Sequence, residues 1–263
     1  MAILKGDIDF TGSIGNLSAY KMRGLDKTIL RSKGGASKKK ILKAPEFKLT
    51  RQNFTEFSGC AKMGGSIRRS MLVMAPVADY NYTPVLNALA KIIQGLDTKG
   101  MRGERAISLS SHGHLLNGFT LNRNTSLESI VKHPISCVID RAAGKAIVQL
   151  PELTPGVNLV LNKKYPLFRF IVNLGCVGDR VFTSRGYMTE EKDTESESVY
   201  TDWHHAGEAF PGREISVQLK DIADLTDTIS LILSVGIQMG IPITPSVVNP
   251  VKYAGSAKIL EVG

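Results

Sequence analysis

A single stretch of helical periodicity, residues 45 to 74, constrains the fold of this chain more than any other feature. Two series of residues repeat there every seven positions and together form one stripe along a helix. The first series is Phe47, Phe54 and Ala61, and the second is Thr50, Phe57, Gly64 and Met71. Something must cover such a stripe. We therefore expect a packing or assembly face made of Phe47, Phe54, Phe57, Gly64 and Met71.

The middle of this predicted helix is poor in side chains. The small residues there are Gly59, Cys60, Ala61, Gly64, Gly65 and Ser66. Each glycine costs roughly 1 kcal/mol of helix propensity relative to alanine, so their presence needs a reason. Either another element approaches the helix very closely, or the helix bends or breaks near Gly64 and Gly65. The sequence leaves both alternatives open.

A second helix is predicted from Pro84 to about Gly95, with Thr83 as its N-cap. Pro45 likewise suits the start of the first helix, because proline lacks the N–H that would stay unpaired there. The two helices, joined by a short loop, form a helical hairpin. Further along, residues 125 to 128 have the pattern of a capping box, which predicts one short helix ending near Val131.

The amino-terminal residues predict a small β unit. Runs of β-favouring residues near 8–12, 17–22 and 27–32 are separated by glycine, asparagine and aspartate turns. Two or three strands alone are marginally stable in water, so this unit must pack on the rest of the chain or pair with another copy. A flexible basic linker that contains Lys38, Lys39 and Lys40 then leads into the first helix.

The last part of the chain alternates β-rich runs with turn residues. The runs are 134–140, 145–151, 157–162, 168–177, 198–204, 214–220, 228–239 and 256–262. No helical pattern lies between them, so the spacing predicts an antiparallel β-sandwich of immunoglobulin or fibronectin type. The fold class is therefore α+β. We expect a β-strand arm and basic linker over residues 1–43, a helical region over 44–131 and the sandwich over 132–263.

The charge is divided unevenly along the chain. Residues 1–75 hold 15 Lys and Arg against 5 Asp and Glu, a net of +10, whereas the remaining residues hold 18 against 19, a net of −1. A basic patch is formed by Lys38, Lys39, Lys40, Arg68 and Arg69, and an acidic loop by Glu190, Glu191, Asp193, Glu195 and Glu197. Opposite charges on opposite halves favour head-to-tail association of copies. The lysines could instead contact nucleic-acid phosphates or belong to a solvated linker.

The amino-terminal segment combines Gly12, Gly15-Asn16, Tyr20, Arg23-Gly24 and Arg31 with the basic linker and the amphipathic helix that follow. In this pattern it resembles a set of uncharacterised Bacteroidota proteins. These proteins share a β-rich carboxyl-terminal half, and the resemblance covers residues 8 to 60. It implies a bacterial origin and no particular activity, so it assigns no site residues.

No catalytic signature is visible, and we expect no enzyme activity, no cofactor and no small-molecule substrate. The histidine pairs His112 with His114 and His204 with His205 have no spacing that joins them into a metal site. There is no nucleophile elbow, P-loop or dinucleotide fingerprint. The three cysteines, far apart and odd in number, indicate free thiols in a reducing compartment. With no predicted membrane span, we expect a cytoplasmic protein without a membrane partner.

These observations favour a non-enzymatic structural or scaffold protein that associates with itself into a homo-oligomer or filament. The small β unit, the small-residue flank of the helix and the opposite charges all support this hypothesis. The alternative is a sequence-tolerant nucleic-acid-binding protein that uses the basic amino-terminal third. A monomeric module that binds another protein or a glycan is a third possibility, because sandwiches host many partners.

Overall fold

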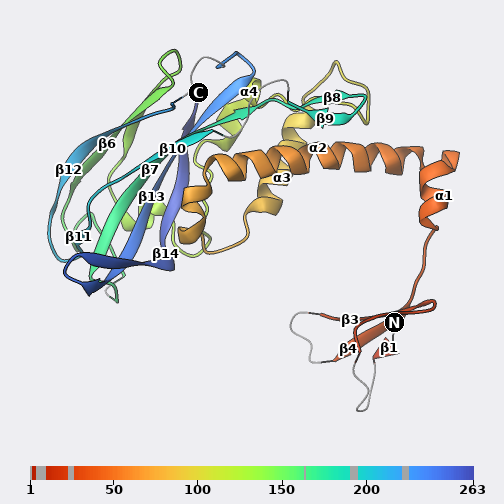
Figure 1. The fold of residues 1–263 in the computed structure, drawn as a ribbon, viewed down its shortest axis with the longest axis horizontal. Coiled ribbons are helices and arrows are strands. Elements are labelled where there is room, and N and C mark those ends of the chain that lie inside the picture. Colours follow the sequence, from red (N-terminus) through yellow and green to blue (C-terminus); the bar gives the residue numbers. More distant parts are fainter. Residues whose placement is uncertain (1, 4–9, 23–26, 163, 190–194, 221–224) are drawn as a thin grey trace. The chain divides into compact units, whose positions relative to one another are not determined.

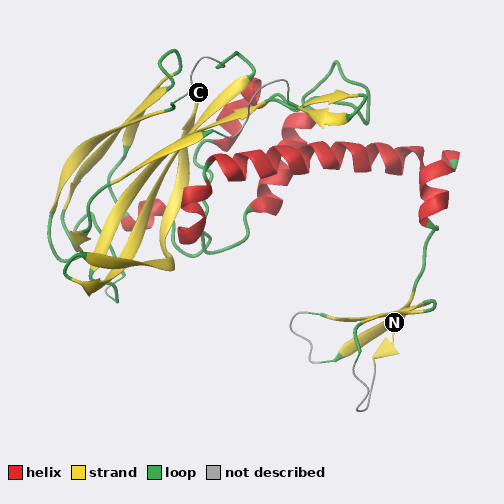
Figure 2. Ribbon diagram, in the orientation of Figure 1, coloured by secondary structure: helices red, strands yellow, loops and turns green. Residues whose placement is uncertain are grey.

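The chain divides into two compact units, Met1–Arg51 and Gln52–Gly263, which are described separately (Figure 1). The computed structural model describes residues 2–3, 10–22, 27–162, 164–189, 195–220 and 225–263. The larger unit contains residues 52–131 of the predicted helical region together with the predicted sandwich, and residues 44–51 belong to the smaller unit. The fold class is α+β, as predicted, with helices and several antiparallel sheets (Figure 2).

The N-terminal unit contains a four-stranded antiparallel sheet in the order β1-β4-β3-β2. Its elements are β1 (Ala2–Ile3), β2 (Gly12–Ile14), β3 (Leu17–Lys21), β4 (Thr28–Ser32), α1 (Lys38–Lys43) and the 3-10 turn η1 (Pro45–Phe47). The strands predicted at 17–22 and 27–32 are confirmed. Of the run predicted at 8–12, residues 8 and 9 lie outside the described residues, residues 10 and 11 belong to no strand, and β2 begins at Gly12, where the run was expected to end.

Helix α1 occupies part of the segment that was predicted to be a flexible linker. The side-chain oxygen of Ser37 accepts a hydrogen bond from the Lys40 N–H at 3.2 Å and caps the helix. Lysine has high helix propensity, so a serine cap followed by lysines suffices to start a short helix. Residues 38–43 are therefore helical, and none of them is buried.

Helix α2 (Lys48–Ser70) is the long predicted helix, and it runs without interruption through Gly64 and Gly65. The two glycines therefore do not break the helix. The 3-10 turn η2 (Leu72–Val77) follows, and helix α3 (Thr83–Gly95) completes the predicted hairpin. Thr83 is the first residue of α3 rather than its cap. Its N–H donates to the side-chain oxygen of Asn81 at 3.2 Å.

Short elements link the helical hairpin to the sheets. They are α4 (Leu109–His112), the 3-10 turn η3 (Gly113–Leu116) and α5 (Leu127–Ile130). The short helix predicted near Val131 is α5, and its cap is Ser126, whose side-chain oxygen accepts from the Ser129 N–H at 3.2 Å. Glu128, the last residue of the predicted capping box, forms an ion pair with Lys258 instead of closing the box.

The strands of the larger unit form two main antiparallel sheets and a small hairpin. Their bounds are β5 (Ser136–Asp140), β6 (Lys145–Leu153), β7 (Leu167–Gly178), β8 (Val181–Thr183), β9 (Gly186–Met188), β10 (Ser196–Tyr200), β11 (His204–His205), β12 (Phe210–Gln218), β13 (Ile229–Thr244) and β14 (Val247–Val262). One sheet has the order β10-β7-β13-β14 with β11 also paired to β7, and the other has the order β12-β6-β5. Strands β8 and β9 pair only with each other.

Most of the predicted β runs are strands, and one is not. Residues 157–162, predicted as a strand, form a turn held by isolated bridges from Leu159 to Val131 and Pro155. The run is apolar enough to resemble a strand. Its first residues instead close a turn, in which the side-chain oxygen of Asn158 accepts from the Thr154 N–H at 2.6 Å, and its backbone bonds to the segment after α5 rather than to a sheet.

The five-stranded sheet is covered on both faces, which explains why β7 is almost entirely apolar. Alternate side chains of β7, such as Phe170 and Val172, enter a core shared with the β12-β6-β5 sheet. Their neighbours Ile171 and Val177 enter a second core formed with α2, η2 and α3. Figure 1 shows these helices on one side of β7 and β13, with β6 and β12 on the other. The helical hairpin is thus part of the same folded body as the sheets.

Candidate functional site

Helix α2 carries the residues that the sequence marked for packing, and its two faces differ sharply within the larger unit. The buried face consists of Glu56, Gly59, Cys60, Met63, Gly64, Ser66, Ile67 and Ser70. Of the predicted packing face, Gly64 and Met71 are buried inside the unit, whereas Phe54 and Phe57 are exposed. Phe47 lies outside this unit, in η1, and is partly buried. The predicted stripe is therefore divided between the interior and the surface.

Two glycines on the buried face permit very close packing. A Cβ atom at Gly59 would lie 2.7 Å from the ring of Tyr187, on β9. At Gly64 it would lie 2.2 Å from the side-chain oxygen of Asn87, on α3. Both distances are far shorter than van der Waals contact, so only glycine fits at these positions. Of the alternatives that the sequence left open, the close approach of other elements to the helix is therefore correct.

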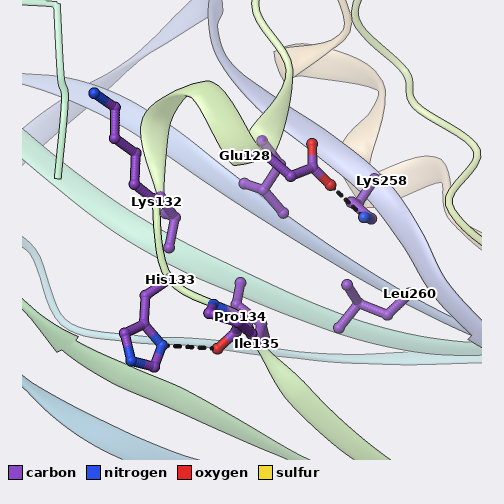
Figure 3. A pocket seen from close by; sticks show the side chains of 9 residues that line it. Glu128, Lys132, His133, Pro134, Ile135, Lys258 and Leu260 are labelled. Atoms are coloured by element: carbon purple, nitrogen blue, oxygen red, sulfur yellow. Dashed lines mark hydrogen bonds and ion pairs between the residues drawn. The ribbon is translucent and has the colours of Figure 1, made fainter. Parts of the chain in front are cut away.

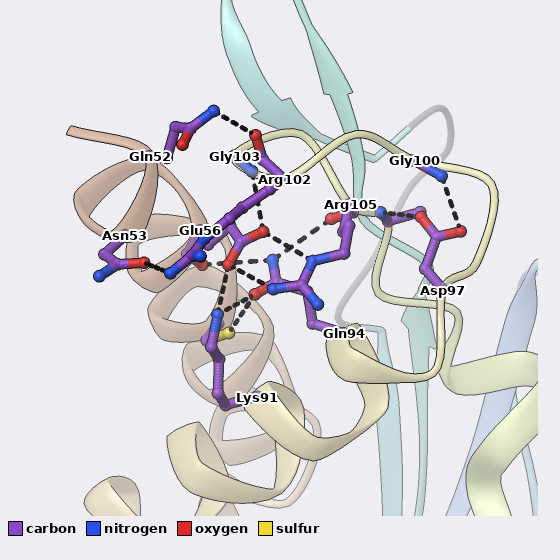
Figure 4. A network of polar contacts seen from close by, with 12 residues as sticks. Gln52, Asn53, Glu56, Lys91, Gln94, Asp97, Gly100, Arg102, Gly103 and Arg105 are labelled. Carbon is purple, nitrogen blue, oxygen red and sulfur yellow. Dashed lines mark hydrogen bonds and ion pairs between the residues drawn. The ribbon is translucent and has the colours of Figure 1, made fainter. Parts of the chain in front are cut away.

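A buried carboxylate, Glu56, lies at the centre of a network of polar contacts between α2, α3 and the loop after α3 (Figure 4). Its oxygens accept hydrogen bonds from Nε and Nη2 of Arg105, at 2.7 and 2.8 Å. They also accept from the Gly103 N–H at 2.9 Å and from Lys91 Nζ at 2.5 Å. Two cations and one amide thus compensate for the burial of one charge.

This environment favours the ionised form of Glu56. The hydrogen bonds from Arg105 lower its pKa to about 2, aided by Lys91 and Gly103 and opposed by desolvation. A carboxylate held so firmly ionised is unsuited to accept a proton near neutral pH. We therefore read the network as a structural clamp on the loop that contains Gly103 and Arg105.

Neutral groups extend the clamp towards the β8–β9 hairpin. The hydroxyl of Tyr187 donates to the carbonyl oxygen of Arg105 at 2.7 Å and accepts from Nε2 of Gln94 at 3.0 Å. Cys60 lies beside them, and its thiol donates to Oε1 of Gln94 at 3.5 Å. Desolvation by burial raises the pKa of Cys60 to about 11, so the thiol stays protonated and unreactive. No nucleophile is activated among these described residues.

The opposite face of α2 is open. Phe54 and Phe57 are 59% and 60% exposed, and they lie one turn apart on the helix. Ala61 and Gly65 follow on the same side, and a Cβ atom at Gly65 would meet only Nη1 of Arg69, at 3.5 Å. Exposed aromatic side chains beside small residues are typical of an interaction surface rather than of a solvated helix face.

The predicted basic patch is divided between the two units. Lys38, Lys39 and Lys40 lie on α1, where all three are exposed, and Lys40 forms an ion pair with Glu46 at 3.2 Å. Arg68 and Arg69 lie at the end of α2 in the larger unit and are also exposed. The two groups thus belong to separately folded parts of the chain.

The predicted acidic loop is described only in part. Glu190, Glu191 and Asp193 lie outside the described residues. Glu197 forms an ion pair with Lys220 at 2.7 Å, and Oε1 of Glu195 accepts from the Lys220 N–H at 3.2 Å. These two carboxylates therefore have partners within their own unit. The predicted pairing of the acidic loop with the basic patch of another copy stays a prediction.

A pocket of about 510 Å³ lies between α5 and β14 (Figure 3). It is lined by Leu127, Glu128, Val131, Lys132, His133, Pro134, Ile135, Lys258 and Leu260. Glu128 and Lys258 form an ion pair, Nδ1 of His133 lies 3.1 Å from the Pro134 carbonyl oxygen, and Lys132 points away from them. The pocket offers apolar walls, and its described polar groups do not converge on a ligand.

The four paired histidines do not meet. The rings of His112 and His114 are 6.3 Å apart, and the half-buried His204 packs against Phe168 and Phe210. Among the described residues, no cluster of His, Cys, Asp or Glu could hold a metal ion. Within that same part of the chain, no helix combines the length and apolar character needed to cross a membrane.

Sequence reasoning missed the Glu56 network. Glu56 and Arg105 are 49 residues apart, and Arg105 belongs to a segment without periodicity. The one available signal was a single acidic residue on a helix face that is otherwise uncharged. No protein-family model, curated protein or solved structure matches this chain. The site must be interpreted from its own geometry.

Proposed function

We propose that this chain is a non-enzymatic structural protein that associates with copies of itself, and that its N-terminal β unit engages a neighbouring copy. One observation carries the proposal: this unit has almost no core. Among its described residues only Ala19, Thr28 and Ile29 are buried. Its exposed apolar side chains are Ile3, Ile14, Leu17, Met22, Leu42 and Leu49.

A sheet of this size cannot offset its own conformational entropy with so little burial. Folded units below about 40 to 60 residues usually need a disulfide, a metal or a partner. The three cysteines of this chain are all free and all lie in the larger unit. The exposed leucine, isoleucine and methionine side chains supply the apolar surface that a second chain would cover.

The β-rich part of the larger unit would serve as a rigid platform for such an assembly. Its two antiparallel sheets share one apolar core, and this supports the predicted sandwich. The immunoglobulin- or fibronectin-like form of that sandwich belongs to the proposal. The protonated thiol and firmly ionised carboxylate of the Glu56 network support the non-enzymatic part of it.

The test is the mass of the nuclease-treated full chain by light scattering, with negative-stain images, at low and high salt. We expect particles much heavier than the 28.6 kDa chain. Replacing both Ile14 and Leu17 by serine should reduce that mass, because the substitutions remove exposed apolar area from the N-terminal sheet. A monomeric wild type in both buffers would refute the proposal.

A second candidate function is sequence-tolerant binding of nucleic acid. The observation that favours it is helix α1, which carries four lysines in six residues and has no acidic residue in its first turn. Clustered lysines bind phosphates by releasing condensed counterions, so affinity should fall steeply with salt. The triple substitution of Lys38, Lys39 and Lys40 by glutamate separates the two functions. Loss of DNA retention with unchanged mass would favour nucleic-acid binding, and loss of mass would favour charge-mediated assembly.

A further inference from the structure

We infer that the exposed face of α2 pairs with the same face of a second copy, antiparallel, about a twofold axis through Ala61. The inference rests on the proposed self-association and specifies one contact within it. The face consists of Phe54, Phe57, Ala61, Gly65 and Arg68, all in the larger unit. Their spacings of three and four residues place them in one line along the helix.

The order of these residues makes the face complementary to itself. Phe57 and Gly65 each lie four positions from Ala61, and they lie on opposite sides of it. Across a twofold axis, a residue meets the one that is equally distant on the other side. The large ring of Phe57 would therefore face Gly65 of the second copy, which has no side chain.

The space above Gly65 is free to receive such a ring. A Cβ atom added there would meet only the tip of the Arg69 side chain, whereas a Cβ atom at the adjacent Gly64 would collide with Asn87. Gly64 is thus explained by packing within the unit, and Gly65 is not. A ring from another molecule would explain Gly65, because a small residue facing a large one lets two helices approach closely.

The charge of Arg68 favours a second copy as the partner and an antiparallel orientation of the two helices. Phe54 and Arg68 each lie seven positions from Ala61, so antiparallel pairing brings the guanidinium of one copy to the exposed ring of the other. Among the described residues, Arg68 has no acidic partner. Parallel pairing would instead place the Arg68 side chains of the two copies opposite each other, and it would leave both Gly65 positions unfilled.

Two further cations beside the face are hydrogen-bonded within their own unit. Lys62 follows Ala61 directly, and its amine donates to the Tyr187 carbonyl oxygen at 2.7 Å. Arg69 donates through Nη2 to the hydroxyl oxygen of Ser66 at 2.9 Å. Its other terminal nitrogen, Nη1, lies 3.5 Å from the Cβ position of Gly65, so this flexible tip shifts when the Phe57 ring of the second copy enters.

The first experiment introduces a cysteine at the predicted axis of the full-length protein. Ala61→Cys should form a disulfide-linked dimer under mild oxidation, because two Cys side chains on a close twofold axis come within bonding reach. The control is Ser58→Cys, at a position that is exposed, whereas Ala61 is half-buried, so the control thiol is the more accessible of the two. In the proposed pair, position 58 of one copy lies about 9 Å along the helix axis from position 58 of the other, so this variant should crosslink several-fold less. Wild type reports the background of its own free cysteines.

The second experiment places a side chain at position 65, where the Phe57 ring of the other copy should lie. Gly65→Gln in the Ala61→Cys background should abolish the crosslink, while far-UV circular dichroism and the urea midpoint stay unchanged or improve, because the helix loses a glycine. Phe57→Gln should also abolish it. A crosslink that survives both substitutions, or that forms equally in Ser58→Cys, would overturn the inference.

The outcomes separate this inference from the proposed function. A wild type that is monomeric by light scattering overturns both. If the wild type assembles but the Ala61→Cys variant does not crosslink, only the helix pairing is overturned, and another surface must cover this face of α2. An assembled wild type, together with a crosslink that Gly65→Gln removes, supports both.

Discussion

The two units of this chain differ in how their apolar and charged side chains are satisfied. In the larger unit, two continuous cores cover both faces of the five-stranded sheet, and a carboxylate at the edge of one core has a full set of donors. In the N-terminal unit, few described side chains are buried and its ion pair is exposed. The larger unit therefore has the core of an independently stable domain, and the smaller one does not; its dependence on a partner belongs to the proposed function.

Ion pairs provide the largest test of this comparison. Glu56→Ala would leave Arg105 and Lys91 without their shared carboxylate, so we expect a loss of roughly 3–5 kcal/mol in the free energy of unfolding. The control is Glu46→Ala, which removes an exposed pair with Lys40. That change should cost about 0–1 kcal/mol. Urea unfolding followed by circular dichroism measures both, and equal losses would contradict the comparison.

The pH dependence of stability should come from the same carboxylate. The pKa of Glu56 is lowered from 4.5 to about 2 in the folded protein, so the unfolded chain binds more protons between these values. Stability from Glu56 is therefore fully present above pH 4.5 and is lost as the pH falls towards 2. The loss is on the order of 3 kcal/mol. Urea midpoints measured from neutral to strongly acidic pH should fall less steeply for Glu56→Gln than for wild type, and parallel curves would refute this.

Two adjacent glycines distinguish a packed helix face from an open one. Gly64→Ala places a methyl group against Asn87, and overpacking of this kind costs roughly 1–3 kcal/mol. Gly65→Ala meets only Nη1 of Arg69, at an ordinary contact distance of 3.5 Å, so it should stabilise α2 within one copy by up to about 1 kcal/mol. The two substitutions are chemically identical. Shifts of the thermal midpoint in opposite directions from wild type would therefore confirm that one face of α2 is packed and the other is open. The comparison is made at a protein concentration at which the chain is monomeric, and destabilisation by both would mean that the Gly65 face is also covered within its own chain.

The smallest expected effect concerns the N-terminal sheet. Ile14→Ser changes an exposed side chain in a unit without a core, so the unfolding free energy of the larger unit should shift by less than about 0.5 kcal/mol. Hydrogen exchange resolved by peptide should show the same result, with protection unchanged in β7 and β13. A clear loss of protection in those strands would show that the larger unit depends on the smaller one.

The local elements of the fold follow closely from the sequence. The seven-residue repeat predicted α2, proline marked the starts of η1 and α3, and turn residues separated most of the strands. Residues 157–162 misled because an apolar run has the same composition whether it extends into a sheet or closes a turn. The lysines after Ser37 were interpreted as a linker because their charge dominated the pattern, although their helix propensity is high.

The candidate site was predictable only in part. Phe54, Phe57 and Met71 share one helical period, but the residues that α2 buries repeat with the same period on the adjacent side. Periodicity shows that a helix has faces and does not show which face the rest of the chain covers. The Glu56 network was invisible, because its donors come from positions 35 to 49 residues away in the sequence.

The sequence by itself determined the fold class, the long helix, the β-rich last half and the concentration of positive charge near the amino end. These properties depend on local propensity and on the order of residues along the chain. Only the tertiary structure decided that Gly59 and Gly64 admit Tyr187 and Asn87, that Glu56 is a buried clamp, and that Phe54 and Phe57 remain exposed. Such outcomes depend on which distant segments come together, since burial is a property of the packed molecule and not of any one segment.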